Sequence, residues 1–338
     1  MQPIPVYGEQ RISNIETLRL VAVFSLVAYH TIGTTAQSGL ELAYPHPLRY
    51  AADLLIDLRM PMFAFISGWI YAQRPVAPNG FGGFFLSKAR RLYIPGVVAA
   101  VSFWTISTFI VPDTAGQNAP IVNVVTLTYV HYWFLHAILI TLLGISVVEA
   151  LWRAPLGPFA LGVSALIFFL LPGIYIPFLH LNGVLYLAPF FLIGVLIARQ
   201  EDLVHQMRTT VVIVSVTAAG IGLALNMETL LSTGAMSLDR RDLQSALLSI
   251  GLIILLLLFL PRLKALSGFG SIAFTIYLYH VFGTSGMRRA AEAVGIESIP
   301  VMFILCVAAG FGVPIMIHFL FLQTVTTRTF VLGIRQRL

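Results

Sequence analysis

The feature that most constrains this chain is a series of long apolar segments. A helix needs about 20 mostly apolar residues to cross the hydrocarbon core of a bilayer. Segments that satisfy this rule fall at roughly 15–34, 52–72, 92–112, 126–148, 156–172, 183–199, 210–226, 243–261, 269–287 and 299–323. They predict an all-α, polytopic integral membrane protein with about ten transmembrane helices.

Composition supports a membrane protein and excludes several other classes. Of the 338 residues, 58% are hydrophobic and 10% are charged, far from the composition of water-soluble globular domains. The formal net charge of +6 comes from basic residues scattered between the apolar segments, which indicates membrane topology and no nucleic-acid surface. The single cysteine, Cys306, excludes a disulfide framework. Because the first apolar segment carries Glu16 and Arg19 and no small-residue cleavage site follows it, we expect a retained helix.

The distribution of basic residues predicts that both termini are cytoplasmic. In that orientation the inner segments hold many more basic residues than the outer ones, as the positive-inside rule requires. The inner residues are Arg11, Arg74, Lys88, Arg90, Arg91, Arg153, Arg199, Arg208, Arg262, Lys264, Arg328, Arg335 and Arg337, and the outer residues are Arg49, Arg240, Arg241, Arg288 and Arg289. All connections are short, the longest lying around 227–242, so we expect one membrane domain over residues 1–338 without an appended soluble domain.

Prolines single out the fifth and sixth predicted spans. Pro172, Pro177 and Pro189 interrupt them, and membrane helices tolerate such breaks where neighbouring helices or water satisfy the backbone. We therefore expect these two spans to line a cavity.

The first span carries three ionisable residues, which are functional candidates because charge is costly inside a membrane. Arg19 and His30 are eleven residues apart, so on a helix they lie within roughly 20° of the same face and about 16 Å apart along the axis. Glu16 precedes Arg19 by three residues, a spacing at which side chains meet. The alternatives are an ion pair that anchors the helix end and a histidine that only packs.

Five segments together carry a family resemblance. They are IETLRLVAVFSLVAYH at 15–30, RMPMFAFISGWI at 59–70, KARRLYIP at 88–95, YWFLHAIL at 132–139 and GSIAFTIYLYH at 270–280. In order and spacing the chain resembles the membrane acyltransferase-3 family, whose signature is a basic residue, ten intervening residues and a histidine. Arg19 and His30 fit that signature, although Glu16 stands where family members more often carry Asp. The Met-Pro-Met-Phe form of the second span is most similar to the branch of sugar O-acetylases and glucan succinylases.

The resemblance implies an O-acyltransferase. Members transfer acetyl or other short acyl groups, generally from coenzyme A thioesters such as acetyl-CoA, to hydroxyls of glycans, glycolipids or small molecules. It further implies polysaccharide modification at the bacterial inner (cytoplasmic) membrane. Under this hypothesis His30 acts as general base or covalent nucleophile, while Arg19, held by Glu16, positions the donor or stabilises developing negative charge. The sequence leaves the acyl group, the acceptor and homo-oligomerisation open.

The donor's phosphates require a cationic binding place, and one basic group stands at the expected position. Lys88, Arg90 and Arg91 lie at the predicted cytoplasmic start of the third span, and the planar fork of arginine suits phosphate oxygens. The alternative is that these residues only follow the positive-inside rule. With the resemblance, we interpret them together with Arg19 as the donor-binding residues.

The remaining candidates concern the acceptor. We predict substrate contacts for Arg59, Ser67, Trp133, Tyr277 and His280. Three of them have a structural alternative: Arg59 could pair with Asp53 or Asp57, Ser67 beside Gly68 could serve close helix packing, and Trp133 could be an interfacial aromatic residue.

Two other classes of protein stay open, and a metal enzyme is not expected. His131 and His136 are five residues apart, on different faces of a helix, and no spacing typical of a zinc site occurs. A secondary transporter or flippase for a glycan precursor or small metabolite also combines many spans, broken helices and intramembrane charges. A non-catalytic component of a polysaccharide export assembly is the third hypothesis.

Overall fold

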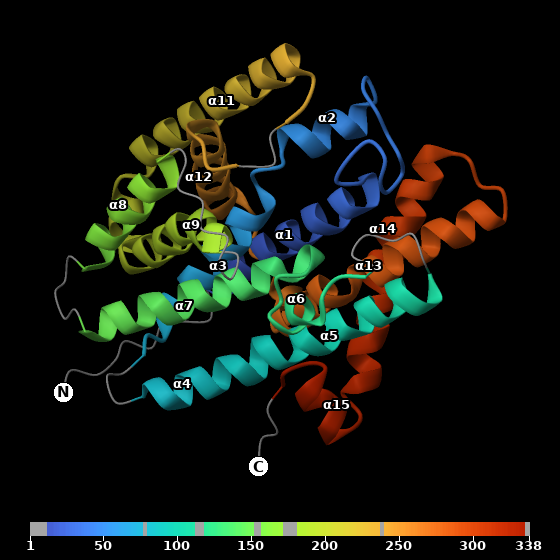
Figure 1. Ribbon diagram of the computed structural model, residues 1–338. Coiled ribbons are helices and arrows are strands. Elements are labelled where there is room, and N and C mark those ends of the chain that lie inside the picture. The colour runs from blue at the N-terminus through green and yellow to red at the C-terminus, as the bar shows by residue number, and fades with distance from the viewer. Residues whose placement is uncertain are drawn as a thin grey trace.

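The computed structural model describes residues 12–76, 80–111, 118–151, 157–171, 181–236 and 240–334, and within these ranges every regular element is helical. Figure 1 shows a bundle of long helices with short helices at its margins. The long helices are α1 (Ile12–Ile32), α3 (Arg59–Gln73), α5 (Ile94–Thr105), α7 (Trp133–Leu151), α8 (Gly157–Leu170), α9 (Leu181–Arg199), α11 (Arg208–Thr233), α12 (Leu243–Phe259), α13 (Phe269–Ala293) and α14 (Ile299–Phe321). The shorter ones are α2 (Pro47–Leu54), α4 (Phe81–Lys88), α6 (Ile121–Val125), α10 (Glu201–Gln206) and α15 (Val325–Phe330).

The predicted class, an all-α polytopic membrane protein, is confirmed. Six helical stretches are long and apolar enough to cross a membrane, and a seventh arises if α2 and α3, bent by 40° at their junction, form one span. Each of the ten predicted segments overlaps a helix, but α8, α12 and α13 are too short or too polar to meet that criterion. The count of ten and the cytoplasmic position of the termini stay predictions.

The third predicted span begins earlier than the sequence suggested. One unbroken helical stretch runs over Phe81–Ile110, because the apolar FGGFFLSK segment continues the helix in the amino-terminal direction. Two π-helical segments, η1 (Ala89–Tyr93) and η2 (Ile106–Ile110), interrupt its α-helical geometry. Single π turns inside α-helices occur frequently at functional sites. The η1 segment contains two residues of the predicted donor-binding group.

Of the three prolines that were expected to interrupt the fifth and sixth spans, one lies within the described residues. Pro172 and Pro177 lie outside them. Pro189 lies inside α9, which continues through it to Arg199. The connection predicted around 227–242 is shorter than expected, because α11 extends to Thr233 and ends at the left-handed Gly234.

Glycines bring the backbones of two helix pairs, α3–α9 and α13–α14, into direct contact. A Cβ atom added to Gly68 of α3 would lie 1.9 Å from the carbonyl oxygen of Phe191 in α9, and one added to Gly194 would lie 2.1 Å from that of Phe65. The same holds at Gly283 of α13, where the Ala309 oxygen of α14 would be 2.2 Å away. Small residues drive helix association in membranes because they permit such close approach. The reciprocal α3–α9 contact fixes the helix that follows the bend.

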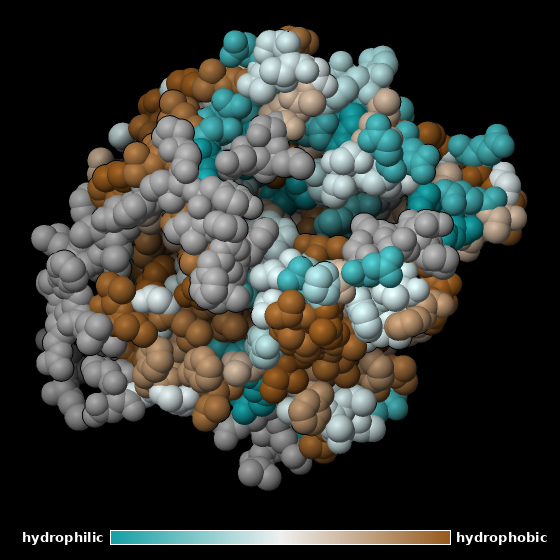
Figure 2. All heavy atoms as spheres, in the orientation of Figure 1, coloured by the Kyte–Doolittle hydropathy of each residue, from teal (hydrophilic) through white to brown (hydrophobic). Residues whose placement is uncertain are grey.

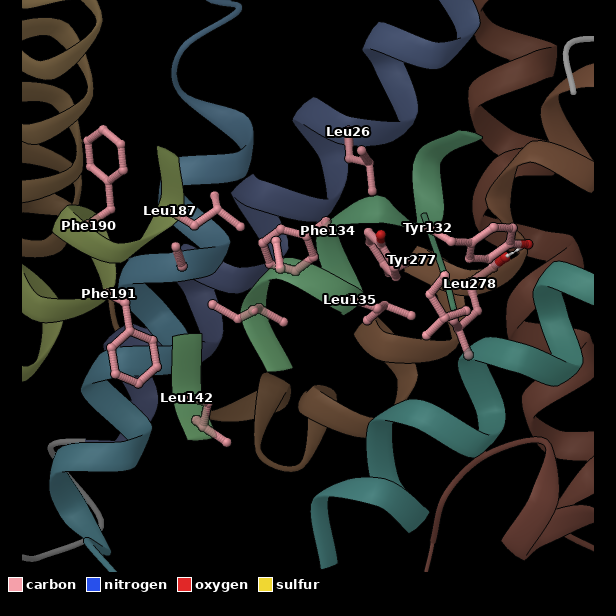
Figure 3. Close-up of a cluster of buried hydrophobic side chains, with 14 of the residues drawn as sticks. Leu26, Tyr132, Phe134, Leu135, Leu142, Leu187, Phe190, Phe191, Tyr277 and Leu278 are labelled. Atoms are coloured by element: carbon pink, nitrogen blue, oxygen red, sulfur yellow. Dashed lines mark hydrogen bonds between the residues drawn. The ribbon is translucent and has the colours of Figure 1, made fainter. Parts of the chain in front are cut away.

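The apolar centre of the bundle is assembled from helices that are distant in sequence. Figure 3 shows Leu26 of α1, Phe134 of α7, Leu187 of α9 and Leu278 of α13 converging on one buried cluster. Outside, large apolar side chains are common on the surface, as expected of helices that face lipid. On the face seen in Figure 2, hydrophilic residues gather toward α2 and the α13–α14 connection.

Helices α1 and α13 run in parallel, in matched register. At one end, Thr17 donates a hydrogen bond to the carbonyl oxygen of Pro261 (2.9 Å), and Gly270 adjoins the guanidinium of Arg19. At the other end, the rings of His30 and His280 have centroids 5.0 Å apart. Ten or eleven helical residues, a rise of about 15–16 Å, separate the two contacts on each helix. Helix α13 therefore accompanies α1 from Arg19 to His30.

Candidate functional site

Three histidines meet where α1 ends. His30 comes from α1, His131 from η3 (Val130–Tyr132), the single turn before α7, and His280 from the middle of α13. Their ring centroids lie 5.8 Å (His30–His131), 5.0 Å (His30–His280) and 5.4 Å (His131–His280) apart, so the rings form a triangle. His280 is completely buried, whereas His30 and His131 are partly exposed. The exposed edge of the triangle is therefore formed by His30 and His131.

The hydrogen bonds of His280 determine its neutral tautomer. Its Nδ1 lies 2.9 Å from the carbonyl oxygen of Tyr277 and 3.1 Å from that of Ile276, and carbonyl oxygens only accept. The proton therefore sits on Nδ1, and Nε2 is an acceptor. That Nε2 atom is buried without a hydrogen-bond partner, and so is Nε2 of His131. Such unpaired buried atoms are rare in structures unless a ligand, water or proton completes them.

Two tyrosines hold the η3 turn against α13. Tyr277 donates its hydroxyl proton to the carbonyl oxygen of His131 (2.7 Å), and Tyr132 donates to that of Leu278 (3.0 Å). Figure 3 shows Tyr132 directed at Leu278, with the second of these bonds dashed. Both tyrosine hydroxyls are buried and already bonded. The predicted substrate residue Tyr277 therefore positions the backbone of His131.

Arg59 lies at the first position of α3, beside the histidines, and the structural alternative for it, a pair with Asp53 or Asp57, is not formed. Its guanidinium carbon lies 3.2 Å from the ring centre of Tyr29, and that ring centre is 5.7 Å from the ring of His30. Both acidic neighbours have other partners: Asp53 pairs with Arg49, and Asp57 pairs with Arg240. Arg59 is only 8% exposed, and its Nε has no hydrogen-bond partner among the described residues.

Asp57 is the centre of a separate network, in which its carboxylate is fully bonded. Its two carboxylate oxygens accept hydrogen bonds from Arg240 Nε (2.6 Å) and Nη2 (2.5 Å), Ser245 Oγ (2.8 Å) and Asn226 Nδ2 (2.9 Å). Asn226 belongs to α11 and Ser245 to α12, whose first turn is capped by Asp242. The network therefore ties both helices to the bend before α3.

The segment that follows His30 is also tied down. Arg49 donates to the carbonyl oxygen of Gly33 (2.8 Å) and pairs with Asp53 of the same helix, α2. Asp53 further accepts a hydrogen bond from Tyr44, and burial together with this bond raises the pKa of Tyr44. The carboxyl end of α1, and with it His30, is thereby held in place.

Arg19 and Glu16 lie at the far end of α1 and form the predicted ion pair. The Arg19 guanidinium lies against the start of α13, where a Cβ added to Gly270 would come within 2.5 Å of Nη1. Since α1 is continuous from Ile12 to Ile32, Arg19 and His30 are about 16 Å apart along the axis. The structure thus keeps them at opposite ends of one site.

The basic group at the third span lies about two to three turns inside its helix, not at its start. Lys88 ends α4, with its ammonium 5.0 Å from the ring centre of Phe84, while Arg90 and Arg91 belong to η1. Arg91 is exposed, and Arg90 is partly buried with an unpaired Nε. No hydrogen bond or ion pair connects these residues to Arg19 within the described part of the chain.

Two further predicted residues pack between α3, α7 and α9. The Ser67 hydroxyl donates to the carbonyl oxygen of Phe63 one turn earlier (2.8 Å). Trp133 lies against Gly183 and Tyr186 of α9. Substrate contacts by these side chains stay predictions. Among the described residues, no group of three or more histidine, cysteine, aspartate or glutamate side chains is arranged to hold a metal ion.

Comparison with known protein families identifies the family of this protein. Residues 12–319 match the acyltransferase domain of the acyltransferase-3 family, a range that contains every candidate residue above. The chain belongs to the membrane acyltransferase-3 family. No curated protein and no solved structure matched it. This acyltransferase therefore acts on an acyl donor and an acceptor, and the transporter and export-component hypotheses do not describe its family.

Sequence reasoning missed three residues of this acyltransferase. His131 was set aside because its partners were sought on its own helix, whereas they lie on α1 and α13. Arg240 was counted only as a topology signal, and Asn226 was not considered. The available signal for Arg240 was Asp57, a carboxylate inside the second predicted span that required a basic partner.

Proposed function

We propose that this protein transfers a short acyl group, acetyl in the simplest case, from a cytosolic acyl-CoA to a hydroxyl of a glycan, glycolipid or small molecule on the other side of a bacterial inner membrane. The observation that carries the proposal is the position of His30. It is a partly exposed member of the histidine triangle, and it shares one continuous helix with Arg19 at the opposite end. A reaction between a donor on one side and an acceptor on the other needs such an extended site.

The chemistry at His30 is acyl transfer to an alcohol. Neutral imidazole removes the hydroxyl proton as the oxygen attacks the thioester carbonyl, and collapse of the tetrahedral intermediate expels the coenzyme A thiolate, which takes up that proton. His30 has no hydrogen bond to another described side chain, so its nitrogens are available to the substrate. A covalent acyl-imidazole on His30 is the alternative course.

The other predicted residues serve the donor. Arg19, oriented by Glu16, lies about 16 Å from His30, a distance that requires an extended donor arm between them. We propose that Lys88, Arg90 and Arg91 bind the donor's phosphates, since arginine suits phosphate oxygens geometrically. The π-helical geometry of η1 supports this role, because it alters the direction of these side chains relative to a regular helix.

The test compares two histidine variants in the purified, full-length protein. We expect His30→Ala to abolish acyl transfer from acetyl-CoA, measured as free thiol release and as acylated host glycans by mass spectrometry, with an unchanged melting midpoint. His205→Ala, at an exposed histidine, is the matched control and should retain activity. Intact transfer in His30→Ala would overturn the proposal. Acid-quenched protein that carries one acyl mass on the peptide of His30 would identify the covalent course.

A further inference from the structure

Arg59 is a buried cation without a counter-charge. Other arginines in the described chain, Arg19, Arg49, Arg199 and Arg240, each pair with a carboxylate. For Arg59 no carboxylate lies within ion-pair distance among the described residues, because Asp53 and Asp57 are taken. An uncompensated charge at membrane depth costs several kcal/mol or more and is retained where it serves a ligand. The fold thus holds a cation ready beside His30.

The orientation of Arg59 defines what it can bind. Its guanidinium carbon lies 3.2 Å from the ring centre of Tyr29, so the aromatic ring covers one face of the cation. The N–H donors of a guanidinium lie around its edge, in a fork that matches two carboxylate oxygens. One of these donors, Nε, is buried and unpaired. An unpaired donor on the guanidinium edge suits a planar anion such as a carboxylate.

We propose that Arg59 binds a permanent carboxylate on one of the two substrates that meet at His30. The inference rests on the proposed function. It specifies that either the acyl donor or the acceptor carries a carboxylate group. That carboxylate is carried either by a dicarboxylic acyl group on the donor or by an acidic acceptor such as a uronic acid. In both cases Arg59 fixes one end of the substrate while His30 acts at the other.

The experiment compares ligands that differ only in a carboxylate. In the donor arm, binding of succinyl-CoA and butyryl-CoA, which share a four-carbon chain, is measured by thermal stabilisation of the detergent-solubilised full chain. In the acceptor arm, methyl glucuronide is compared with methyl glucoside. Wild-type protein should prefer the acid in one arm by at least about tenfold, as expected for hydrogen bonds to a charged group. The arm that shows the preference identifies the source of the carboxylate.

Variants then assign the preference to Arg59. Arg59→Gln should remove it, Arg59→Lys should retain part of it, and Arg289→Gln, at an exposed arginine, should leave it intact. Absence of a preference in wild type, a preference that survives in Arg59→Gln, or an equal loss for acidic and neutral ligands would each overturn the proposal. Because both arms measure binding, failure of the proposed function is seen separately, as wild-type protein that consumes no acyl-CoA.

Discussion

Two polar clusters meet at the first turn of α3, and they differ in how completely their atoms are bonded. The Asp57 network gives both carboxylate oxygens two donors each. Beside it, the His30 site leaves Nε2 of His131, Nε2 of His280 and Nε of Arg59 without partners. A buried polar group that finds every partner inside the protein stabilises the fold, while an unsatisfied one marks a place left for something else. The Asp57 carboxylate is therefore satisfied within the protein, although Nη1 of its partner Arg240 is itself unpaired, whereas three buried atoms around His30 lack a partner among the described residues.

The largest effect on stability should follow from removing one charged residue of the Asp57 network. We expect Asp57→Ala and Arg240→Met each to lower the free energy of unfolding by about 3–5 kcal/mol, because each leaves a buried charge unpaired. Denaturant unfolding in detergent micelles measures the loss. The control is Glu292→Gln, which breaks the exposed pair with Arg288 and should cost less than about 1 kcal/mol. Equal losses in all three variants would contradict the comparison.

A substitution at Arg59 should change the free energy of unfolding in the opposite direction. Arg59→Met removes a buried charge that has no carboxylate partner in the described chain, so we expect stability to be kept or raised by up to about 2 kcal/mol, as at many active-site positions. Unfolding midpoints of Arg59→Met and Arg240→Met, measured side by side, check this. If both variants are destabilised alike, Arg59 is a structural residue.

A smaller effect is expected where the two tyrosines join η3 to α13. Tyr277→Phe and Tyr132→Phe each remove one hydrogen bond to a carbonyl oxygen and should cost about 0.5–1.5 kcal/mol. Only Tyr277 bonds to His131 itself, so we expect acyl transfer to fall further in Tyr277→Phe than in Tyr132→Phe. Initial rates at saturating donor distinguish them, and identical rates would remove the positioning role.

The smallest effect should be at Ser67. Its hydroxyl bonds within its own helix, so Ser67→Ala should change stability by no more than about 0.5 kcal/mol. We expect the KM for either substrate to stay unchanged. A large increase in the KM of one substrate, with kcat preserved, would instead restore the predicted substrate contact.

How much of the structure the sequence could predict depends on how far apart along the chain the interacting residues lie. The helical class, the position of each segment and the Glu16–Arg19 pair depend on neighbours within a few turns, and all were predicted. Arg240 meets Asp57 across 183 positions of sequence, and no spacing rule reaches that far. His131 was missed for the same reason, since its ring partners belong to other helices. The same long-range pair takes Asp57 away from Arg59, for which it was a possible partner.

The parallel register of α1 and α13 has a consequence for the surrounding lipid. A bilayer that is thicker or thinner than the protein's apolar belt tilts its helices or is itself deformed. Neither response changes the rise between Arg19 and His30, or between Gly270 and His280, because each distance lies within one unbroken helix. The length over which a donor must extend is therefore a constant of the polypeptide, independent of the thickness of the membrane in which it works.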